Sequence, residues 1–578
     1  MNEGQSWAGI EWTKFEDVDG LAARIRRDNG VSEFLAKCLA RLEPALGSAD
    51  EVRAFLSPEL SNYYDPYAML NMDKAVYRLR QAIDAHERIR IVTDYDVDGT
   101  MSSLILQATL KVFGHTSLSY HIPHRQLEGY GFSMLAAEAA VSDGMNLIVT
   151  ADIGVRDVES IRYAQSHGVD VIVLDHHLPE GCGVPADAYA VVCPPQEGCS
   201  YPNPNLAACG IALKLAQAML AGRKNDALLI RSLSKLAALG TIADVVSLRD
   251  IENRAIVSVG LRALNGEIPN NPGLSALLRV SKMDAGQVDA SAVAFGLAPR
   301  INAAGRLSTA TRVIELLNAG NSVQAQTLAD ELGQMNEVRK QIQEAMVERA
   351  REALESERDK PFLFVAFEEG DWWKSGIVGI VAGRLKEHFQ KSVAVGTIGG
   401  DEIVCSMRTT PGVHAVEALN SVAKHLQRYG GHRAAAGFTL KVSEFECVKS
   451  GLCASAESQL CGKAEVLRET YVETLTLEDI DAGVFEDVDR LEPCGTKNGH
   501  PNICLDAVEI GGTLCKNGSV RCVFHCNGGD LTAWIPSCLA EKWMAEAGRK
   551  AKLFGTLEKD YFRGSVQRTF RVKDVILD

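Results

Sequence analysis

Hydrophobic and polar residues follow different periods along the chain, and the period changes several times. In residues 1–75, apolar residues recur every three or four positions, as in LAARIRR and SEFLAKCLARL, which predicts helices. In residues 76–320, short apolar runs such as IRIVT, NLIVT and VDVIVL alternate with helical stretches. This alternation is typical of a doubly wound parallel sheet. We therefore expect an α/β protein whose first sheet follows a helical segment.

The second half of the chain shows three further patterns. Residues 321–358 form one long amphipathic stretch, with apolar residues from Leu328 to Leu354 at helical spacing, and predict a helix that links two domains. Residues 359–462 combine strand-like runs such as KPFLFVAF with glycine-rich turns, and predict a smaller α/β domain. Residues 463–578 consist of short alternating stretches broken by Gly and Asn, a spacing that fits a small β-barrel such as an OB-fold.

The composition agrees with a globular protein of several domains. The chain has 578 residues, of which 46% are hydrophobic and 23% charged, enough for three or four cores. No apolar run reaches the roughly 18 residues of a membrane helix, and the first twenty residues lack a signal-peptide pattern. We therefore expect a cytoplasmic protein that does not bind a membrane, and its 15 cysteines to be reduced thiols.

The net charge of −15 argues against a protein that coats nucleic acid. It does not exclude an enzyme that acts on nucleic acid. A carboxylate-rich metal site adds to the negative total, and a local basic groove can still bind a phosphate backbone.

Carboxylate and imidazole groups follow four apolar segments of residues 76–320. They are Asp94, Asp96 and Asp98 in DYDVDG, Asp152 in ADIG, Asp175, His176 and His177 in DHH, and Asp244 in GTIAD. Because the carboxyl ends of parallel strands share one edge of a sheet, we expect these groups to converge. The DYDVDG loop resembles a calcium-binding EF-hand, but position twelve is Ile105 and a strand precedes the loop, which excludes that site. Oxygen and nitrogen ligands in this number suit two Mn²⁺ or Mg²⁺ ions that clamp a phosphate and activate water.

The four motifs, in this order, resemble those of the DHH phosphoesterase superfamily of metal-dependent phosphohydrolases. Further segments resemble the RecJ family within it, namely IPHRQLEGYG, APRINAAGRL, RYGGHRAAAGF and LEPCGTKNGHP. The resemblance covers nearly the whole chain. It implies a DHH catalytic domain at 76–320, a DHH-associated domain at 359–462 and an OB-fold nucleic-acid-binding domain at 463–578.

The resemblance also implies roles for individual residues. It implies metal ligands at Asp94, Asp96, Asp152, His176 and Asp244, with Asp152 bridging two ions. Asp98 and Asp175 are then ligands or groups that orient the imidazoles, and His177 is the candidate for contacting the scissile phosphate.

Positive groups and glycines are expected to hold the phosphates, because charge develops on the phosphate oxygens during hydrolysis. The candidates are Arg125, Arg300, Asn302, Arg306, Lys374, Arg408, Gly430, Gly431, His432 and Arg433. The resemblance implies that the GGH segment, residues 430–432, faces the catalytic site across a groove. In the C-terminal domain, Trp534, Phe524, Tyr561 and Phe562 are candidates for base stacking or for the core, and Lys559 and Arg563 are candidates for surface contacts.

Three residues depart from the pattern of the family. Lys374 stands where a histidine is common, Cys193 where Asn usually precedes Pro, and Cys494 where Phe is usual. None of the three is an expected metal ligand. Lys374 could still bind phosphate, so we expect it to alter the grip on the substrate and not the chemistry.

The sequence thus predicts a single-stranded-DNA exonuclease that hydrolyses phosphodiester bonds with two metal ions. The resemblance implies 5′ to 3′ polarity, a role in recombination and repair, and a single-strand-binding protein and a RecQ-type helicase as partners. Two alternatives stay open. One is a phosphodiesterase for short oligonucleotides or cyclic dinucleotides, which would gain nothing from the barrel. The other is a catalytically silent scaffold, which would not need five metal ligands.

Overall fold

The first sheet is formed by five parallel strands in the order β3-β2-β4-β5-β6. The strands are β2 (Ile89–Thr93), β3 (Leu118–His121), β4 (Leu147–Ala151), β5 (Asp170–Leu174) and β6 (Ala190–Val192). Both central strands, β4 and β5, are rich in β-branched residues and almost wholly buried, as expected for a sheet covered on both faces. The computed structural model describes residues 6–578 except 18, 126–127, 180–182, 285, 461–466, 517 and 563–564.

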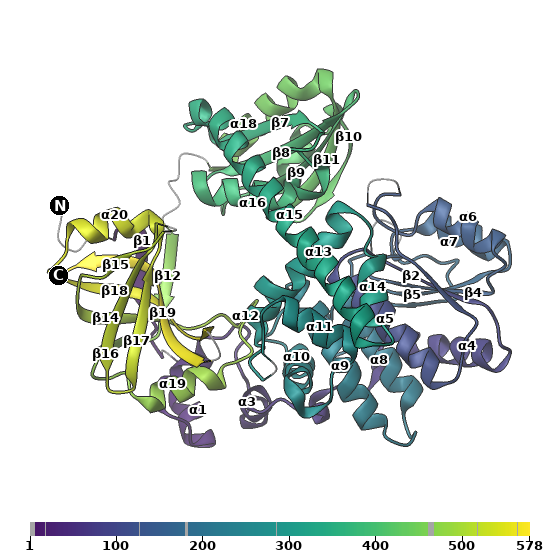
Figure 1. The fold of residues 1–578 in the computed structure, drawn as a ribbon, viewed down its shortest axis with the longest axis horizontal. Helices are drawn as coiled ribbons and strands as arrows, with labels where there is room; N and C mark the ends of the chain where they lie inside the picture. Colours follow the sequence, from purple (N-terminus) through teal and green to yellow (C-terminus); the bar gives the residue numbers. More distant parts are fainter. Residues whose placement is uncertain are drawn as a thin grey trace.

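Helices cover both faces of this sheet, which confirms the predicted doubly wound architecture (Figure 1). α6 (Met134–Ser142) and α7 (Val158–Ser166) pack on one face. α4 (Met72–Asp84), α5 (Val97–Val112) and α8 (Ala208–Leu220) pack on the other. The domain continues with the helices α9 (Asp226–Ala243), α10 (Ile251–Arg262), α11 (Pro272–Val280), α12 (Ala290–Ala292), α13 (Ala298–Leu307) and α14 (Thr311–Leu317).

A single helix of 33 residues, α15 (Ser322–Leu354), leads from this domain to the next (Figure 1). The side chain of Asn321, the N-cap residue of α15, accepts hydrogen bonds from the backbone N–H groups of Val323 and Gln324. The first half of α15 packs on α11, α13 and α14, and its last turns pack on α16 and β7. The predicted linking helix is therefore present and belongs to the cores of both domains that it joins.

The second α/β domain has a five-stranded mixed sheet in the order β10-β11-β9-β8-β7. Its strands are β7 (Phe362–Glu368), β8 (Ser392–Gly399), β9 (Glu402–Arg408), β10 (Leu426–Gly431) and β11 (Ala435–Lys441). Only the pair β7 and β8 is parallel. The helices α16 (Val378–Phe389), α17 (Ala415–Ser421) and α18 (Phe445–Leu460) cover this sheet.

The C-terminal region folds as a seven-stranded sheet that is consistent with an OB-like fold. Its elements are β13 (Thr474–Leu475), α19 (Ala482–Arg490), β14 (Asn502–Glu509), β15 (Thr513–Leu514), β16 (Val520–Cys526), β17 (Gly529–Ile535), α20 (Ser537–Ala545), β18 (Lys550–Phe562) and β19 (Ser565–Leu577). Trp543 and Phe570 are fully buried in its core. Of the stacking candidates, Phe524 packs partly against this core, Trp534 is half-buried, and Lys559 pairs with Asp489 at 3.0 Å. Arg563 and the side chains of Tyr561 and Phe562 lie outside the described residues.

The N-terminal segment contains the expected helices, α1 (Leu21–Asn29), α2 (Glu33–Ala40) and α3 (Ala49–Leu56), and a strand that the sequence did not predict. This strand, β1 (Ile10–Lys14), pairs in parallel with β12 (Leu467–Tyr471) beside the C-terminal sheet (Figure 1). The helical periodicity of the segment gave no sign of this pairing, because β1 is short and its partner lies in another domain. In the described residues, no helix is both long enough and apolar enough to cross a membrane, and the described cysteines are free thiols.

Candidate functional site

The loop between β2 and α5 carries the first three aspartates of the site. Asp94 directly follows β2 and is 5% exposed. Asp96 caps α5, because its Oδ1 accepts a hydrogen bond of 3.0 Å from the N–H of Gly99. A side chain on Gly99 would clash with the backbone of Asp94, so the loop can close this tightly only with glycine. The DYDVDG motif therefore sets two carboxylates side by side at the end of β2.

Asp98 is held by the first turn of α8. Its carboxylate accepts hydrogen bonds from the backbone N–H groups of Ala208 and Cys209, at 2.7 and 2.8 Å. The partial positive charge of this helix N-terminus stabilises the carboxylate. Because both of its oxygens are already bonded, the geometry favours an orienting role for Asp98 over that of a metal ligand.

Asp152 and His176 meet at the ends of the next two strands. Asp152 follows β4 with a φ of 64°, in the left-handed region, and is 3% exposed. One of its carboxylate oxygens lies 3.2 Å from Nε2 of His176, and Nδ1 of His176 lies 3.6 Å from the carboxylate of Asp244. The imidazole of His176 thus lies between two carboxylates that are 92 positions apart in the sequence. Only the fold of the sheet and α9 brings them together.

The segment before Asp244 differs from the strand-like segment that the sequence suggested. Asp244 follows helix α9, not a strand, and is the C-cap of that helix. The apolar run AALGTIA is buried on most sides, and a continuous apolar run is compatible with a buried helix as well as with a strand. Asp244 therefore reaches the sheet edge from a helix end, and the expected convergence with Asp152 and His176 is still present.

The ligand atoms of these residues form three overlapping groups, each lying within 4.8 Å. The groups are Asp94, Asp96 and Asp152; Asp98, His176 and Asp244; and Asp152, His176 and His177. Asp152 belongs to two of them, a position that suits a carboxylate shared by two cations. Within the described residues, the buried atoms Oδ1 of Asp94 and Nε2 of His176 have no hydrogen-bond partner. Buried polar atoms without partners are rare, so this donor set fits bound cations.

The carboxylates of the cluster are buried and repel one another, so a bound positive charge would stabilise them. Burial, followed by repulsion from neighbouring aspartates, raises the pKa of Asp94 and Asp152 well above the ordinary value. The same causes raise the pKa of Asp244 to about 9. Burial lowers the pKa of His176, which favours the neutral imidazole that binds metals. A divalent cation would remove the repulsion between these carboxylates.

His177 is fixed through both of its ring nitrogens. Nδ1 lies 2.7 Å from Oδ1 of Asp175, and Nε2 lies 3.1 Å from the hydroxyl of Tyr130. Asp175 is 1% exposed and also accepts hydrogen bonds from the N–H groups of His177 and Val155. Burial lowers the pKa of His177, but the hydrogen bond that Nδ1 donates to Asp175 and the negative charge of that carboxylate together outweigh burial, so the net shift is upward. Asp175 therefore orients His177 and favours its protonated form.

A groove of about 1060 Å³ separates the two α/β domains beside this cluster. Tyr95, Arg125 and Tyr130 line it on the side of the first domain, and Arg428, Tyr429 and Gly430 line it on the side of the second. Tyr95 lies between Asp94 and Asp96 in the sequence, and Tyr130 contacts His177, so the groove runs beside the cluster. An extended polymer lying in this groove would pass next to the carboxylates.

The arginines predicted to hold phosphate are placed in different ways. Arg125 lies over the ring of Tyr95, with its Cζ 4.3 Å from the ring centroid, and its Nε has no hydrogen-bond partner among the described residues. Arg306 donates to the carbonyl oxygen of Gly376 at 2.9 Å and so ties α13 to the second domain. Burial, together with Arg125 and Arg339, lowers the pKa of Arg306 to about 10. The positive charges of Arg125 and Arg306 therefore lie close together beside the cluster.

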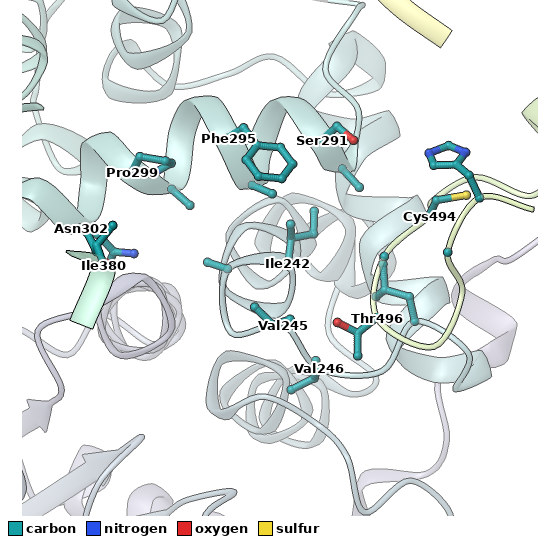
Figure 2. Close-up of a pocket in the computed structure, with 18 of the residues that line it drawn as sticks. Ile242, Val245, Val246, Ser291, Phe295, Pro299, Asn302, Ile380, Cys494 and Thr496 are labelled. Carbon is teal, nitrogen blue, oxygen red and sulfur yellow. The ribbon is translucent and has the colours of Figure 1, made fainter. Parts of the chain in front are cut away.

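Arg300 and Asn302 lie on the same helix, α13. Arg300 donates to the carbonyl oxygen of Gly296 at 2.7 Å, while its Nε is buried without a partner in the described residues. Asn302 lines a second pocket, of about 560 Å³, together with Arg306 and Arg339. Figure 2 shows Asn302 and Ile380 at one end of this pocket, Phe295 and Val245 along it, and Cys494 and Thr496 at the other end.

The candidates in the second domain are only partly gathered at the groove. Gly430 lines it, whereas Gly431, His432 and Arg433 are exposed around the turn between β10 and β11. Arg408 donates to Ser406 and to the carbonyl oxygen of Met407, both at 2.9 Å, and is not among the residues that line the groove. Lys374 is half-buried next to Ser375, which does line it.

Several groove residues are absent from the set predicted from the sequence. Tyr95, Tyr130 and Arg428 line the groove, and Arg339 lines the second pocket. Tyr130 lies in the same segment, IPHRQLEGYG, that supplied Arg125. Tyr130 is uncharged, and its contact with His177 depends on the fold, so its position could not be expected from the sequence.

Two family models match parts of this chain. A family model described as "DHH family, N-terminal domain" matches residues 88–241, and one described as "DHHA1 domain" matches residues 359–452. The single-stranded-DNA-specific exonuclease RecJ of Bacillus subtilis is 35% identical over 461 residues, which cover 79% of this chain and 57% of that protein. The exonuclease RecJ of Dickeya dadantii is 36% identical over 408 residues, which cover 68% of this chain and 70% of that protein.

A solved structure shows the same fold over almost the whole chain. The crystal structure of RecJ from Thermus thermophilus in complex with Mn²⁺ matches with a TM-score of 0.77 and 26% identity, and covers 98% of this chain and 80% of that one. The Thermus protein is also known in complex with Mg²⁺. From the identity to the Dickeya protein and the share of it that is matched, together with the two domain matches, we conclude that this chain belongs to the RecJ family of single-stranded-DNA-specific exonucleases.

Proposed function

We propose that this chain is a metal-dependent exonuclease that degrades single-stranded DNA in the 5′ to 3′ direction. The observation that carries the proposal is the position of Asp152. It belongs to two groups of metal-ligating residues, and these lie beside a groove between two domains. A groove that leads past a metal cluster suits an extended single strand as substrate, and the family resemblance implies that the strand is cut from its 5′ terminus.

The ligands that we propose are those at the sheet edge. Asp94, Asp96 and Asp152, which form one of these groups, would hold one ion. His176, with Asp152 and Asp244 on either side of its ring, would hold the other together with them. Bound Mn²⁺ or Mg²⁺ would supply a nucleophile at neutral pH, by lowering the pKa of water, and would offset the charge of the phosphate. Asp98, bonded to the N-terminus of α8, keeps the loop of Asp94 and Asp96 in place.

His177, Arg125 and Arg306 would act on the substrate itself. His177, whose Nδ1 is held by Asp175, would share the N–H of its Nε2 between the hydroxyl of Tyr130 and a non-bridging oxygen of the scissile phosphate. Arg125 and Arg306 would hold the phosphates on either side, because guanidinium groups match the geometry of phosphate oxygens. Gly430, Lys374 and the exposed His432 and Arg433 would contact the backbone farther along the strand.

The reaction follows from this placement. Water attacks the phosphorus atom, the bond to the 3′ oxygen breaks, and that oxygen receives a proton. The products are a 5′-mononucleotide and a strand that is one nucleotide shorter and still carries a 5′ phosphate. Such trimming serves recombination and repair, where single strands have to be removed or resected.

The partners and the compartment that we propose come from the family. A single-strand-binding protein would deliver the strand, and a RecQ-type helicase would produce it from duplex DNA. The relatives named above are DNA exonucleases of bacteria, whose chromosome lies in the cytoplasm, and we propose the same compartment for this chain. Pull-down with each partner and cell fractionation would test these proposals.

The decisive experiment is digestion of a single-stranded DNA of about forty nucleotides, labelled at the 5′ or the 3′ end, with Mn²⁺ or Mg²⁺. We expect immediate release of a 5′-labelled mononucleotide and stepwise shortening of the 3′-labelled strand. Hydrolysis of dinucleotides without cleavage of the long strand would indicate an oligonucleotide phosphodiesterase instead. Binding without hydrolysis would indicate a scaffold.

Two variants make this assay specific. Asp96→Ala should abolish cleavage, because it removes a proposed ligand. Asp143→Asn is the matched control, because Asp143 is an exposed aspartate of the same domain that pairs only with Arg90 in the described structure. Equal loss of cleavage in both variants would contradict the proposed site.

A further inference from the structure

A second cluster of metal-ligating side chains lies away from the catalytic residues, in the loop between α19 and β14. It consists of Glu492, Cys494 and His500, whose ligand atoms lie within 4.8 Å of one another. Nε2 of His500 is 3.6 Å from Oε1 of Glu492, a separation close to that of two ligands on one tetrahedral ion. Unlike the catalytic cluster, this one contains a thiol.

Arg254 fixes the backbone of the loop that carries the cluster. This buried guanidinium donates to the carbonyl oxygens of Leu491, Glu492 and Pro493, at 3.0, 2.5 and 2.9 Å. Asn498, which is fully buried, donates to the carbonyl oxygens of Leu491 and Pro493 and so joins the two ends of the loop. The positions of Glu492 and Cys494 are therefore set before any ligand binds, which lowers the entropic cost of binding.

The donor atoms are available to a ligand. Nδ1 of His500 is buried and has no hydrogen-bond partner in the described structure. The Sγ of Cys494 makes one long contact, of 3.6 Å, with the carbonyl oxygen of Leu491. Cys494 and His500 also line the second pocket, and Figure 2 shows Cys494 at its end, so an ion can reach them through that pocket.

Burial, supported by Glu492 and Glu558, raises the pKa of the Cys494 thiol well above its usual value, and Arg254 and Arg41 oppose this shift. Thiolate, imidazole and carboxylate together suit zinc, which takes sulfur, nitrogen and oxygen ligands in one tetrahedral site, much better than they suit Mn²⁺ or Mg²⁺. Binding would convert the thiol to a zinc thiolate with release of one proton.

We propose that Glu492, Cys494 and His500 form a binding site for one zinc ion, separate from the catalytic metal centre, with the fourth position open to water. The ion would brace the loop that lies between the C-terminal domain and the catalytic domain. Leu248 N–H donates to the carbonyl oxygen of Thr496 at 2.9 Å, four residues from Asp244, so this loop touches the segment that carries a catalytic ligand. The site would therefore couple the C-terminal domain to the metal centre.

Cobalt substitution tests the proposal on the full chain. Co²⁺ bound to a thiolate absorbs in the near ultraviolet by sulfur-to-cobalt charge transfer, whereas Co²⁺ at the catalytic centre has only oxygen and nitrogen ligands. We expect this band in the parent protein stripped of metal and titrated with Co²⁺, and its loss on addition of Zn²⁺. Cys494→Ser should abolish the band, and His500→Gln should weaken cobalt binding at this site by more than about tenfold.

Two controls make the outcome decisive. Cys538→Ser removes an exposed thiol of α20 and should keep the band. Asp152→Asn disables the proposed catalytic centre and should also keep it, so failure of the zinc site and failure of the proposed function are distinguishable. Absence of the band in the parent protein, or its persistence in Cys494→Ser, would overturn the proposal. If Cys494→Ser does not fold, zinc stoichiometry in His500→Gln decides, with an unchanged value against the site.

Discussion

The hydroxyl of Tyr130 lies 3.1 Å from Nε2 of His177. The same hydroxyl donates to the carbonyl oxygen of Asp152 at 3.3 Å. When His177 is protonated, its two N–H groups point at Asp175 and Tyr130. The hydroxyl of Tyr130 then donates its own hydrogen bond to the backbone carbonyl oxygen of Asp152. One chain of hydrogen bonds thus joins a candidate phosphate-binding imidazole to the strand end that carries a candidate metal ligand.

Tyr130→Phe should lower the rate of strand cleavage by about fivefold to tenfold, the cost of one hydrogen bond to a partly buried ring. The effect should fall on kcat, because the imidazole is left free to turn away from the phosphate. Tyr77→Phe is the matched control, since Tyr77 is 60% exposed on α4 of the same domain. Steady-state kinetics on a labelled single strand provide the measurement, and equal rates for both variants would refute this role of Tyr130.

Asp152→Asn should reduce cleavage by more than about 100-fold, because even residues that only support a metal ligand contribute up to about that much. It should also weaken Mn²⁺ binding, which isothermal titration calorimetry can measure directly. Asp143→Asn should bind Mn²⁺ like the parent protein. An Asp152→Asn protein that binds two ions with parental affinity would show that Asp152 is not a bridging ligand.

The metal-free protein should lose stability as the pH rises. The pKa of Asp244 is raised to about 9, first by burial and then by Asp98 and Asp96, whereas in the unfolded chain it is about 3.9. A raised pKa in the folded state contributes stability that is complete below the unfolded pKa and is lost as the pH passes through the folded pKa. The loss should therefore extend from about pH 4 to about pH 9 in the absence of metal.

Asp244→Asn tests whether ionisation of Asp244 causes this loss of stability with rising pH, because asparagine does not ionise. The metal-free variant should lose less stability than the parent between about pH 5 and pH 9. Mn²⁺ should raise the melting temperature of the parent at pH 8 and have a smaller effect on the variant. Thermal unfolding with a chelator or with Mn²⁺ gives all four values. A parent protein whose metal-free form gains stability over this range would contradict the argument.

Arg125→Ala should weaken binding of single-stranded DNA and reduce the salt slope of the binding constant by about one, because one phosphate contact is lost. Its guanidinium stacks on Tyr95 in the groove. Arg162→Ala is the control, since Arg162 forms an exposed ion pair with Asp187 on the same domain. Fluorescence anisotropy over a range of salt concentrations provides the measurement, and an unchanged slope would place Arg125 outside the strand path.

The convergence of the candidate ligands could be expected from the sequence, because the end of a buried parallel strand is a local feature. A parallel strand that is buried on both faces leaves its polar groups to the residue that follows it, and Asp94, Asp152 and Asp175 all occupy such positions. The long linking helix is predictable for a similar reason, because its periodicity extends over 33 residues.

The remaining features depend on contacts between distant segments. The helical run before Asp244 reads equally well as a strand, and only packing against α5, α8 and α10 decides. The bond from Arg306 to Gly376 and that from Tyr130 to His177 each join separate segments of the fold. No local pattern in the sequence reports such bonds, so the groove residues could be predicted only in part.

The pairing of β1 with β12 bears on how the chain reaches its native state. Glu11 and Arg468 meet across this pairing although 457 positions separate them in the sequence. Contacts between such distant positions close a very long loop and therefore form slowly and late. On the ribosome, residues 10–14 have to wait for their partner until most of the chain has been synthesised. The two α/β domains can fold during that time, so the last step of folding should be the docking of the C-terminal domain against a preformed catalytic core.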